Sequence, residues 1–66
     1  MVEEGQIYKH YKGNTYRILA IAKHSETLEP LVVYQDLADS AKIWARPIAM
    51  FEDTIETGAK RFTLQE

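Results

Sequence analysis

Short runs of β-branched and aromatic residues, separated by turn-forming residues, recur at spacings of about ten positions along this chain. Such side chains favour strands because they pack well on a pleated, half-buried surface. Strands are therefore predicted over residues 6–12, 15–24, 31–36, 43–46, 54–56 and 61–64. The second run is apolar on both faces in its middle, so a helix remains the alternative for that segment.

Short strands joined by tight turns predict a mainly β fold. The expected architecture is a small SH3-like barrel, or a strongly bent antiparallel sheet of five to six short strands with one short helical turn. Pro47 can begin that helical turn, since proline is favoured at the first position of a helix. Ile48 and Phe51, three residues apart, would then share one face. Otherwise Pro47 ends the fourth strand or lies at a sheet edge.

The length of 66 residues leaves room for one core, so residues 1–66 are predicted to form a single domain. Ordering that many residues costs on the order of 100 kcal/mol, which apolar burial must offset almost entirely. Hydrophobic residues make up 45% of the chain, enough to build a core by packing.

The chain has no cysteine, which excludes disulfides and thiolate zinc sites. Its two histidines and scattered carboxylates lack a recognisable ligand spacing, so neither a metal nor a cofactor is predicted.

The formal net charge is −2, with ten acidic and eight basic residues interspersed. Such a chain has no overall positive field to attract nucleic acid or an anionic membrane. The longest apolar run, residues 18–22, is far too short to span a bilayer. The first residues contain neither the basic nor the apolar segment of a secretory signal, so a cytoplasmic location is expected.

Two hairpins can be given an expected register from their connections. A turn at Gly13-Asn14 would place His10 opposite Arg17 and Tyr11 opposite Tyr16. The two histidines would then lie in different places, because His24 falls beyond the start of the first strand.

In the second hairpin, residues 37–42 are expected to form a loop or one helical turn. Pairing across them would place Tyr34 opposite Trp44 and Val32 opposite Arg46.

Four short blocks follow one another along the chain: Tyr-Lys-His-Tyr-Lys-Gly at residues 8–13, His-Ser-Glu-Thr at 24–27, Val-Val-Tyr at 32–34, and Trp-Ala-Arg-Pro-Ile-Ala-Met-Phe at 44–51. This series resembles a family of small bacterial domains of unknown function. Its members have the pattern Tyr-x-His-Tyr-Lys-Gly, His-Ser-Glu-Thr, Val-Val-Tyr and Trp-x-Arg-Pro-x-x-Met-Phe. The resemblance implies a domain that often stands alone in bacteria, and it implies no activity. One departure is that residues 36–42 lack the glycine expected in that connection, which affects only the loop conformation.

An arginine flanked by tryptophan and tyrosine is a common recognition arrangement. Guanidinium stacks on aromatic rings and binds carboxylate or phosphate in a fork, and SH3-like barrels hold extended peptides in aromatic grooves. The sequence therefore favours a non-catalytic binding module for a peptide or a small anionic ligand. In the competing interpretation, the tryptophan and tyrosine form the core and the arginine caps it. The candidate ligand-binding residues are Tyr11, His24, Tyr34, Trp44 and Arg46.

Each histidine could act as a base or bind a ligand, since its pKa lies near neutrality. A structural role is the competing interpretation, in which each ring hydrogen-bonds a backbone carbonyl at a strand end and fixes a loop. His24-Ser25-Glu26 contains the residue types of a hydrolase triad, but consecutive residues point apart and cannot supply its geometry. An enzyme is therefore disfavoured.

Two other functions remain open. A small sheet leaves strand edges that invite pairing, so a homodimeric interaction protein is the first alternative. A single-stranded nucleic-acid binder is the second, because basic residues near the first turn alternate with tyrosines. These basic residues are Lys9, His10, Lys12 and Arg17, which Lys60 and Arg61 could join.

Overall fold

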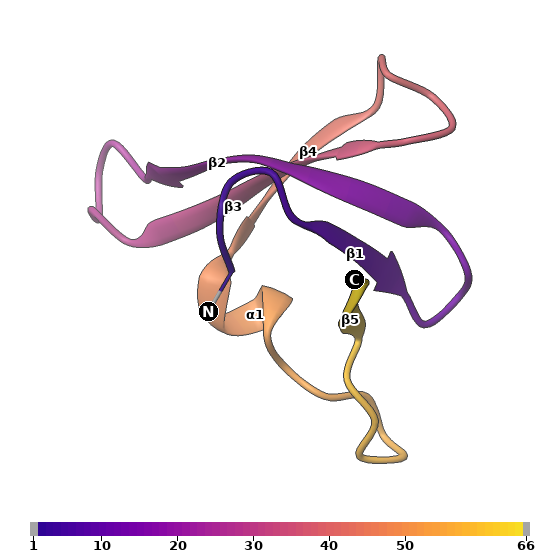
Figure 1. The fold of residues 1–66 in the computed structure, drawn as a ribbon. Coiled ribbons are helices and arrows are strands. Elements are labelled where there is room, and N and C mark those ends of the chain that lie inside the picture. The colour runs from indigo at the N-terminus through magenta and orange to yellow at the C-terminus, as the bar shows by residue number, and fades with distance from the viewer. Residues whose placement is uncertain (1, 66) are drawn as a thin grey trace.

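The structure, a computed structural model, describes residues 2–65 and contains five strands and one short helix. In chain order these are β1 (Ile7–His10), β2 (Thr15–Lys23), β3 (Pro30–Asp36), β4 (Ile43–Pro47), α1 (Ile48–Phe51) and β5 (Phe62–Gln65). The strands form one antiparallel sheet in the order β4-β3-β2-β1-β5 (Figure 1). Because β4 and β5 are its two edges, the sheet is not closed. The bent antiparallel sheet is therefore confirmed, and it is this architecture, rather than a closed barrel, that the chain adopts.

Most of the predicted elements are confirmed. The second run is a strand and not a helix, and Pro47 directly precedes a four-residue helix. The strand predicted over residues 54–56 is wrong, since Thr54 makes only an isolated bridge to Lys60. The chain turns too tightly there for a second ladder. The Gly58 amide donates to the Ile55 carbonyl at 2.9 Å, and Gly58 has a φ of 88°, a left-handed value that favours glycine.

The register expected for β1 and β2 is also wrong. Tyr8 lies opposite Tyr16, so β1 is displaced by three residues from the predicted pairing. The reason is a longer turn. The His10 amide donates to the Asn14 carbonyl at 2.7 Å, which leaves Tyr11, Lys12 and Gly13 as the loop. An odd displacement exchanges the two faces of a strand, so His10 shares a face with Tyr16 and not with Arg17.

The register expected for β3 and β4 is confirmed. Tyr34 lies opposite Trp44 and Val32 lies opposite Arg46. Directly opposite residues of an antiparallel pair point to the same side of the sheet. Trp44 and Arg46 therefore lie on the face that carries the buried Tyr34 and Val32.

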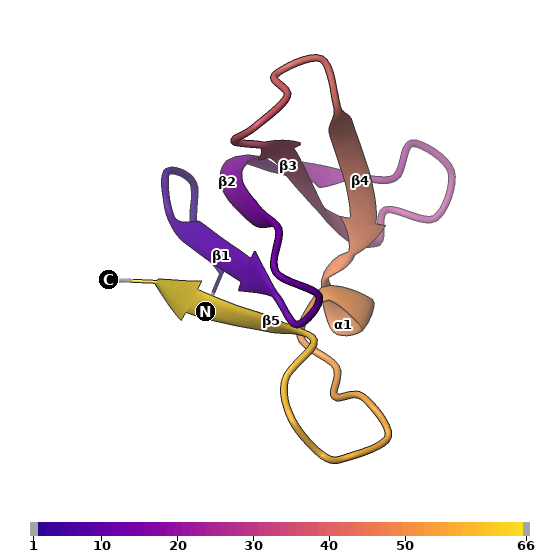
Figure 2. The same cartoon turned by 90° about the vertical axis from the view of Figure 1, so that its right-hand side faces the viewer.

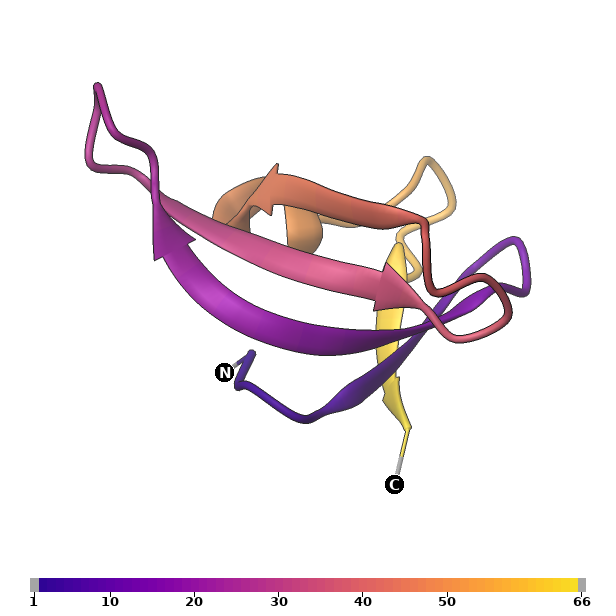
Figure 3. The same ribbon diagram turned by 90° about the horizontal axis from the view of Figure 1, so that it is seen from above.

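We call this face the inner face, because the core forms on it. Its six buried apolar residues are Val2, Ile18, Val32, Tyr34, Phe51 and Phe62. The sheet bends around this core (Figure 3). A register shift between Ile18 and Ala20, which inserts an extra residue into β2, contributes to the bend. Figure 2 shows α1 between the two edge strands, where Phe51 stacks on Phe62 with ring centroids 4.1 Å apart.

The described part of the chain, residues 2–65, contains no helix with the length and apolar character needed to cross a membrane.

Candidate functional site

Near the β1–β2 turn, the inner face and the residues that border it combine rings and cations that are left partly exposed. We call this region the aromatic–basic site. Its side chains come from β1 and the turn after it, from β2, from the edge strand β4 and from the residue before β5. They are His10, Tyr11, Tyr16, Trp44, Arg46 and Arg61.

Arg46 crosses the mouth of the bent sheet. Its guanidinium carbon lies 5.5 Å from the ring centroid of Phe62, on the opposite edge strand. This cation–π contact places the charged group of Arg46 beside a buried ring. Within residues 2–65 the one ion pair is between Arg61 and Asp53, so no carboxylate there neutralises Arg46. This is the charge arrangement expected of a residue that receives an anion from outside.

His10 lies beside that guanidinium on the same face. Its ring packs on the Tyr11 ring at 4.6 Å and edge-on against Phe62 at 4.9 Å. Burial lowers the pKa of His10, and the positive charges of Arg46, Arg61 and Lys12 lower it further. Its Nδ1 accepts a hydrogen bond from the Lys12 amide at 3.2 Å, which requires an unprotonated Nδ1 and leaves Nε2–H as a donor.

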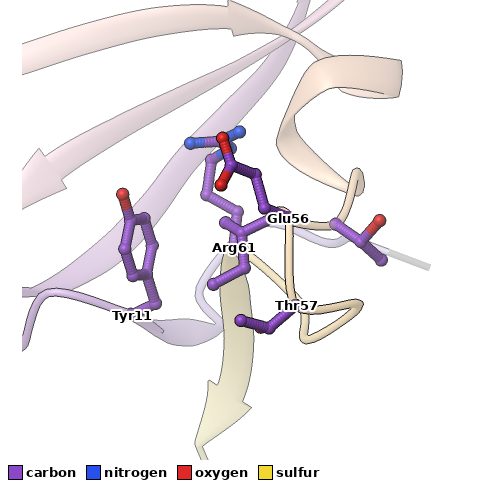
Figure 4. A pocket seen from close by; sticks show the side chains of 6 residues that line it. Tyr11, Glu56, Thr57 and Arg61 are labelled. Atoms are coloured by element: carbon purple, nitrogen blue, oxygen red, sulfur yellow. The ribbon is translucent and has the colours of Figure 1, made fainter.

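Tyr11 and Arg61 border a shallow cavity of about 520 Å³ (Figure 4). The Arg61 guanidinium carbon lies 5.9 Å from the Tyr11 ring centroid, and its Nε donates to Asp53 at 2.9 Å. Figure 4 shows Glu56 and Thr57 on the side of the cavity away from Tyr11. With both an arginine and a glutamate on its walls, this cavity has mixed charge. The unneutralised cation of the site is Arg46.

Trp44 forms the outer margin of the site. Its side chain is 50% exposed, although it lies opposite the buried Tyr34. Residues two apart in a strand are about 6.6 Å apart and point to the same side, so Trp44 and Arg46 are neighbours along the edge of the sheet. An exposed indole beside an unneutralised guanidinium offers an apolar surface and a charge to one ligand.

Asp36 and Tyr16 lie at the boundary between this site and the core. Asp36 is 6% exposed, and its carboxylate accepts from the amides of Ala38 and Asp39 and from Asn14 Nδ2. The Ala38 hydrogen bond lowers the pKa of Asp36 most. Burial raises the pKa of the Tyr16 phenol, which therefore stays neutral and able to donate. The carboxylate of Asp36 thus accepts hydrogen bonds that order the β3–β4 loop.

The structure separates the five candidate residues chosen from the sequence. Tyr11, Trp44 and Arg46 belong to the aromatic–basic site. Tyr34 is 5% exposed and lies beneath it, packed edge-on against Tyr16 at 5.2 Å. His24 directly follows the C-terminal end of β2, about 26 Å along the strand from Tyr16.

There, His24 Nδ1 accepts from the amides of Glu26 and Thr27, at 3.1 and 3.4 Å. The ring thus bonds its local loop, as the structural interpretation expected, but it accepts from amides and does not donate to a carbonyl.

Sequence reasoning missed His10, Tyr16 and Arg61 as members of the site. The first two were missed because the β1–β2 register was displaced. The expected basic patch is divided. Lys9 points away from His10 because the two are adjacent in β1, and the corrected register places Arg17 on the same face as Lys9. For Arg61, a usable signal was its position next to Phe62 at the start of the last predicted strand.

Comparison with known protein families matches residues 6–64 to a family described as protein of unknown function, DUF1653. Among solved structures, the crystal structure of a DUF1653 protein from Bordetella bronchiseptica is similar, with a TM-score of 0.76 and 36% sequence identity. That match covers 94% of this chain and 85% of the other. No curated protein gives a significant match. The resemblance to a family without a known function is thereby confirmed.

Proposed function

The chain belongs to the DUF1653 family of unknown function, so we propose a function from the geometry of the site: a binding domain that recognises a ligand through an anionic group. The anion, a carboxylate or a phosphate, binds the guanidinium of Arg46, and an apolar part of the ligand packs against Trp44. The observation that carries this proposal is that Arg46 lacks a carboxylate partner within residues 2–65 while lying beside an exposed indole.

His10 supports the same assignment. Its neutral ring presents Nε2–H as a further donor near the arginine, without adding a full charge that must be balanced when the site is empty. An anion bound there favours the protonated imidazole, so binding and protonation of His10 reinforce one another. The chain as a whole is acidic, which makes this local excess of positive charge a property of the site.

The test is a titration with inorganic phosphate and with N-acetylphenylalanine, followed through the indole of the chain's only tryptophan. We expect the carboxylate ligand to shift the Trp44 indole N–H signal more than phosphate does, because it also supplies a ring. Replacing Arg46→Ala should weaken binding by about 10- to 150-fold, since a hydrogen bond to a charged group is worth about 1.5–3 kcal/mol.

Arg17→Ala is the matched control. Arg17 is an exposed arginine on the outer face of β2, where it lies opposite Ile7 and Gln35. The Arg17→Ala protein should bind both probes as the unaltered protein does. Equal weakening by the two substitutions would assign the effect to overall charge and reject the aromatic–basic site.

A further inference from the structure

The free edge of β4 runs directly beside this site, and its backbone groups can be assigned a direction. The Asp36 amide donates to the Lys42 carbonyl at 3.0 Å, which makes residues 36 and 42 a hydrogen-bonded pair. Such pairs alternate along an antiparallel ladder, so Trp44 and Arg46 direct their amides toward β3. Ile43 and Ala45 therefore direct their N–H and C=O groups outward, away from the sheet.

This edge is open over a short and defined length. Ile43 is 52% exposed, Ala45 is also exposed, and β4 is the last strand of its side of the sheet. Pro47 ends the usable edge because it has no N–H to donate. The outward groups thus provide two donors and two acceptors, at Ile43 and Ala45, which can pair with one extended segment.

We propose, building on the function proposed above, that the ligand is an extended peptide that adds a strand antiparallel to β4 and presents an acidic side chain to Arg46. Main-chain hydrogen bonds give affinity in this mode of recognition, and alternate side chains give specificity. Across the new ladder Trp44 and Arg46 occupy non-hydrogen-bonded positions, where facing Cα atoms approach to about 4.5 Å. Their side chains would therefore contact the residues opposite them closely.

The geometry also sets the order of residues in the peptide. An antiparallel partner meets Arg46 first and Trp44 two residues later, so an acidic residue should precede an apolar or aromatic one with one residue between them. Charge decides between this occupant and a second copy of the chain. Arg46 lies on β4 itself, and Arg61 and Lys12 add positive charge around the nearby His10, which favours an acidic segment.

The opposite edge, β5, offers no such match: of its two inner-face residues, Phe62 is 5% exposed and packs in the core, and Leu64 carries no charge.

The experiment uses the blocked hexapeptide Thr-Glu-Thr-Phe-Val-Thr, measured by calorimetry and by amide chemical shifts. We expect the amides of Ile43 and Ala45 to shift on binding. Ala45→Pro removes an outward donor at an edge position that tolerates proline, and it should weaken peptide binding about tenfold. Ala45→Ser keeps the N–H and is the matched control, which should bind the peptide more tightly than Ala45→Pro does. A peptide N-methylated at the threonine between Glu and Phe should lose about as much affinity as Ala45→Pro causes.

Three further results separate this inference from the proposal on which it rests. If Ala45→Pro and the N-methylated peptide bind normally, strand addition is rejected while anion binding through Arg46 stands. If Arg46→Ala leaves the affinities for phosphate, N-acetylphenylalanine and the hexapeptide unchanged, the proposed function itself fails. If sedimentation shows a dimer that Ala45→Pro dissociates, a second copy occupies the edge and the peptide assignment is overturned.

Discussion

Burial of the His10 ring lowers its pKa, and the nearby positive charges of Arg46, Arg61 and Lys12 act in the same direction. Both effects disfavour the imidazolium, so its pKa in the folded protein lies below the ordinary value of 6.5. The unfolded chain then binds the proton more readily than the folded one. The stability contributed by His10 is complete above pH 6.5 and is lost as the pH falls below that value through the folded pKa.

Removing one of the three charges should move this pKa in a known direction. In Arg46→Ala we expect the pKa of His10 to rise toward 6.5, and a bound anion should raise it in the unaltered protein. Proton NMR titration of the ring signals measures both shifts, with His24→Gln used to assign the two histidines. A His10 that titrates at or above 6.5 in the unaltered protein would contradict the electrostatic description of the site.

The turn between β1 and β2 decides which face His10 occupies. Gly13 has a φ of 113°, a conformation that an L side chain adopts only with strain. Gly13→Ala should therefore lower the free energy of unfolding by roughly 1–2 kcal/mol. No atom lies within 4 Å of an added Cβ, so the cost comes from the backbone and not from a clash.

Chemical synthesis with D-alanine at position 13 is the matched control, because it adds the same methyl group with the opposite handedness. Denaturant unfolding should show that the D-alanine protein is at least as stable as the unaltered one. Equal destabilisation by both alanines would mean that the methyl group itself, and not the φ angle, causes the loss.

The same turn shows what a sequence can and cannot predict in this domain. Alternation and turn residues were sufficient for β2, β3, β4 and the short helix after Pro47, since these depend on local pattern. The β3–β4 register followed from its loop and placed Trp44 beside Arg46. The β1–β2 register depended on whether the loop has two or three residues, which local pattern did not decide. That single ambiguity exchanged the faces of β1 and removed His10 from the expected site.

Contacts between residues that are far apart in the sequence could not be predicted from local pattern. Arg46 and Phe62 meet because the sheet bends until its two edge strands approach, and no spacing of residues encodes that distance. His24 was chosen for its chemistry, and the structure places it away from the site, with its Nδ1 bonded to local loop amides. Identifying the site required knowing which segments curvature brings together.

At the scale of the whole molecule, the stability of this open sheet depends on α1, which packs against its concave side. Phe51 is 1% exposed and contacts three other rings, stacking on Phe62 and meeting Tyr8 and Tyr34 edge-on at 5.2 and 5.4 Å. It thereby joins the edge strand β5 to β1 and to β3 in the middle of the sheet. Phe62 in turn supports the guanidinium of Arg46, so the core and the site share one aromatic stack.

Phe51→Ala should consequently remove most of the stability of the domain. Truncating a buried phenylalanine costs about 3–5 kcal/mol, while a chain of this length has a total stability of roughly 3–10 kcal/mol. Met50→Ala is the control, since the neighbouring Met50 is 53% exposed and its loss should change stability by no more than about 0.5 kcal/mol. Thermal unfolding followed by circular dichroism measures both variants. A Phe51→Ala protein that unfolds at the same temperature as Met50→Ala would show that α1 does not hold the sheet together, and the support of Arg46 through Phe62 would then need another source.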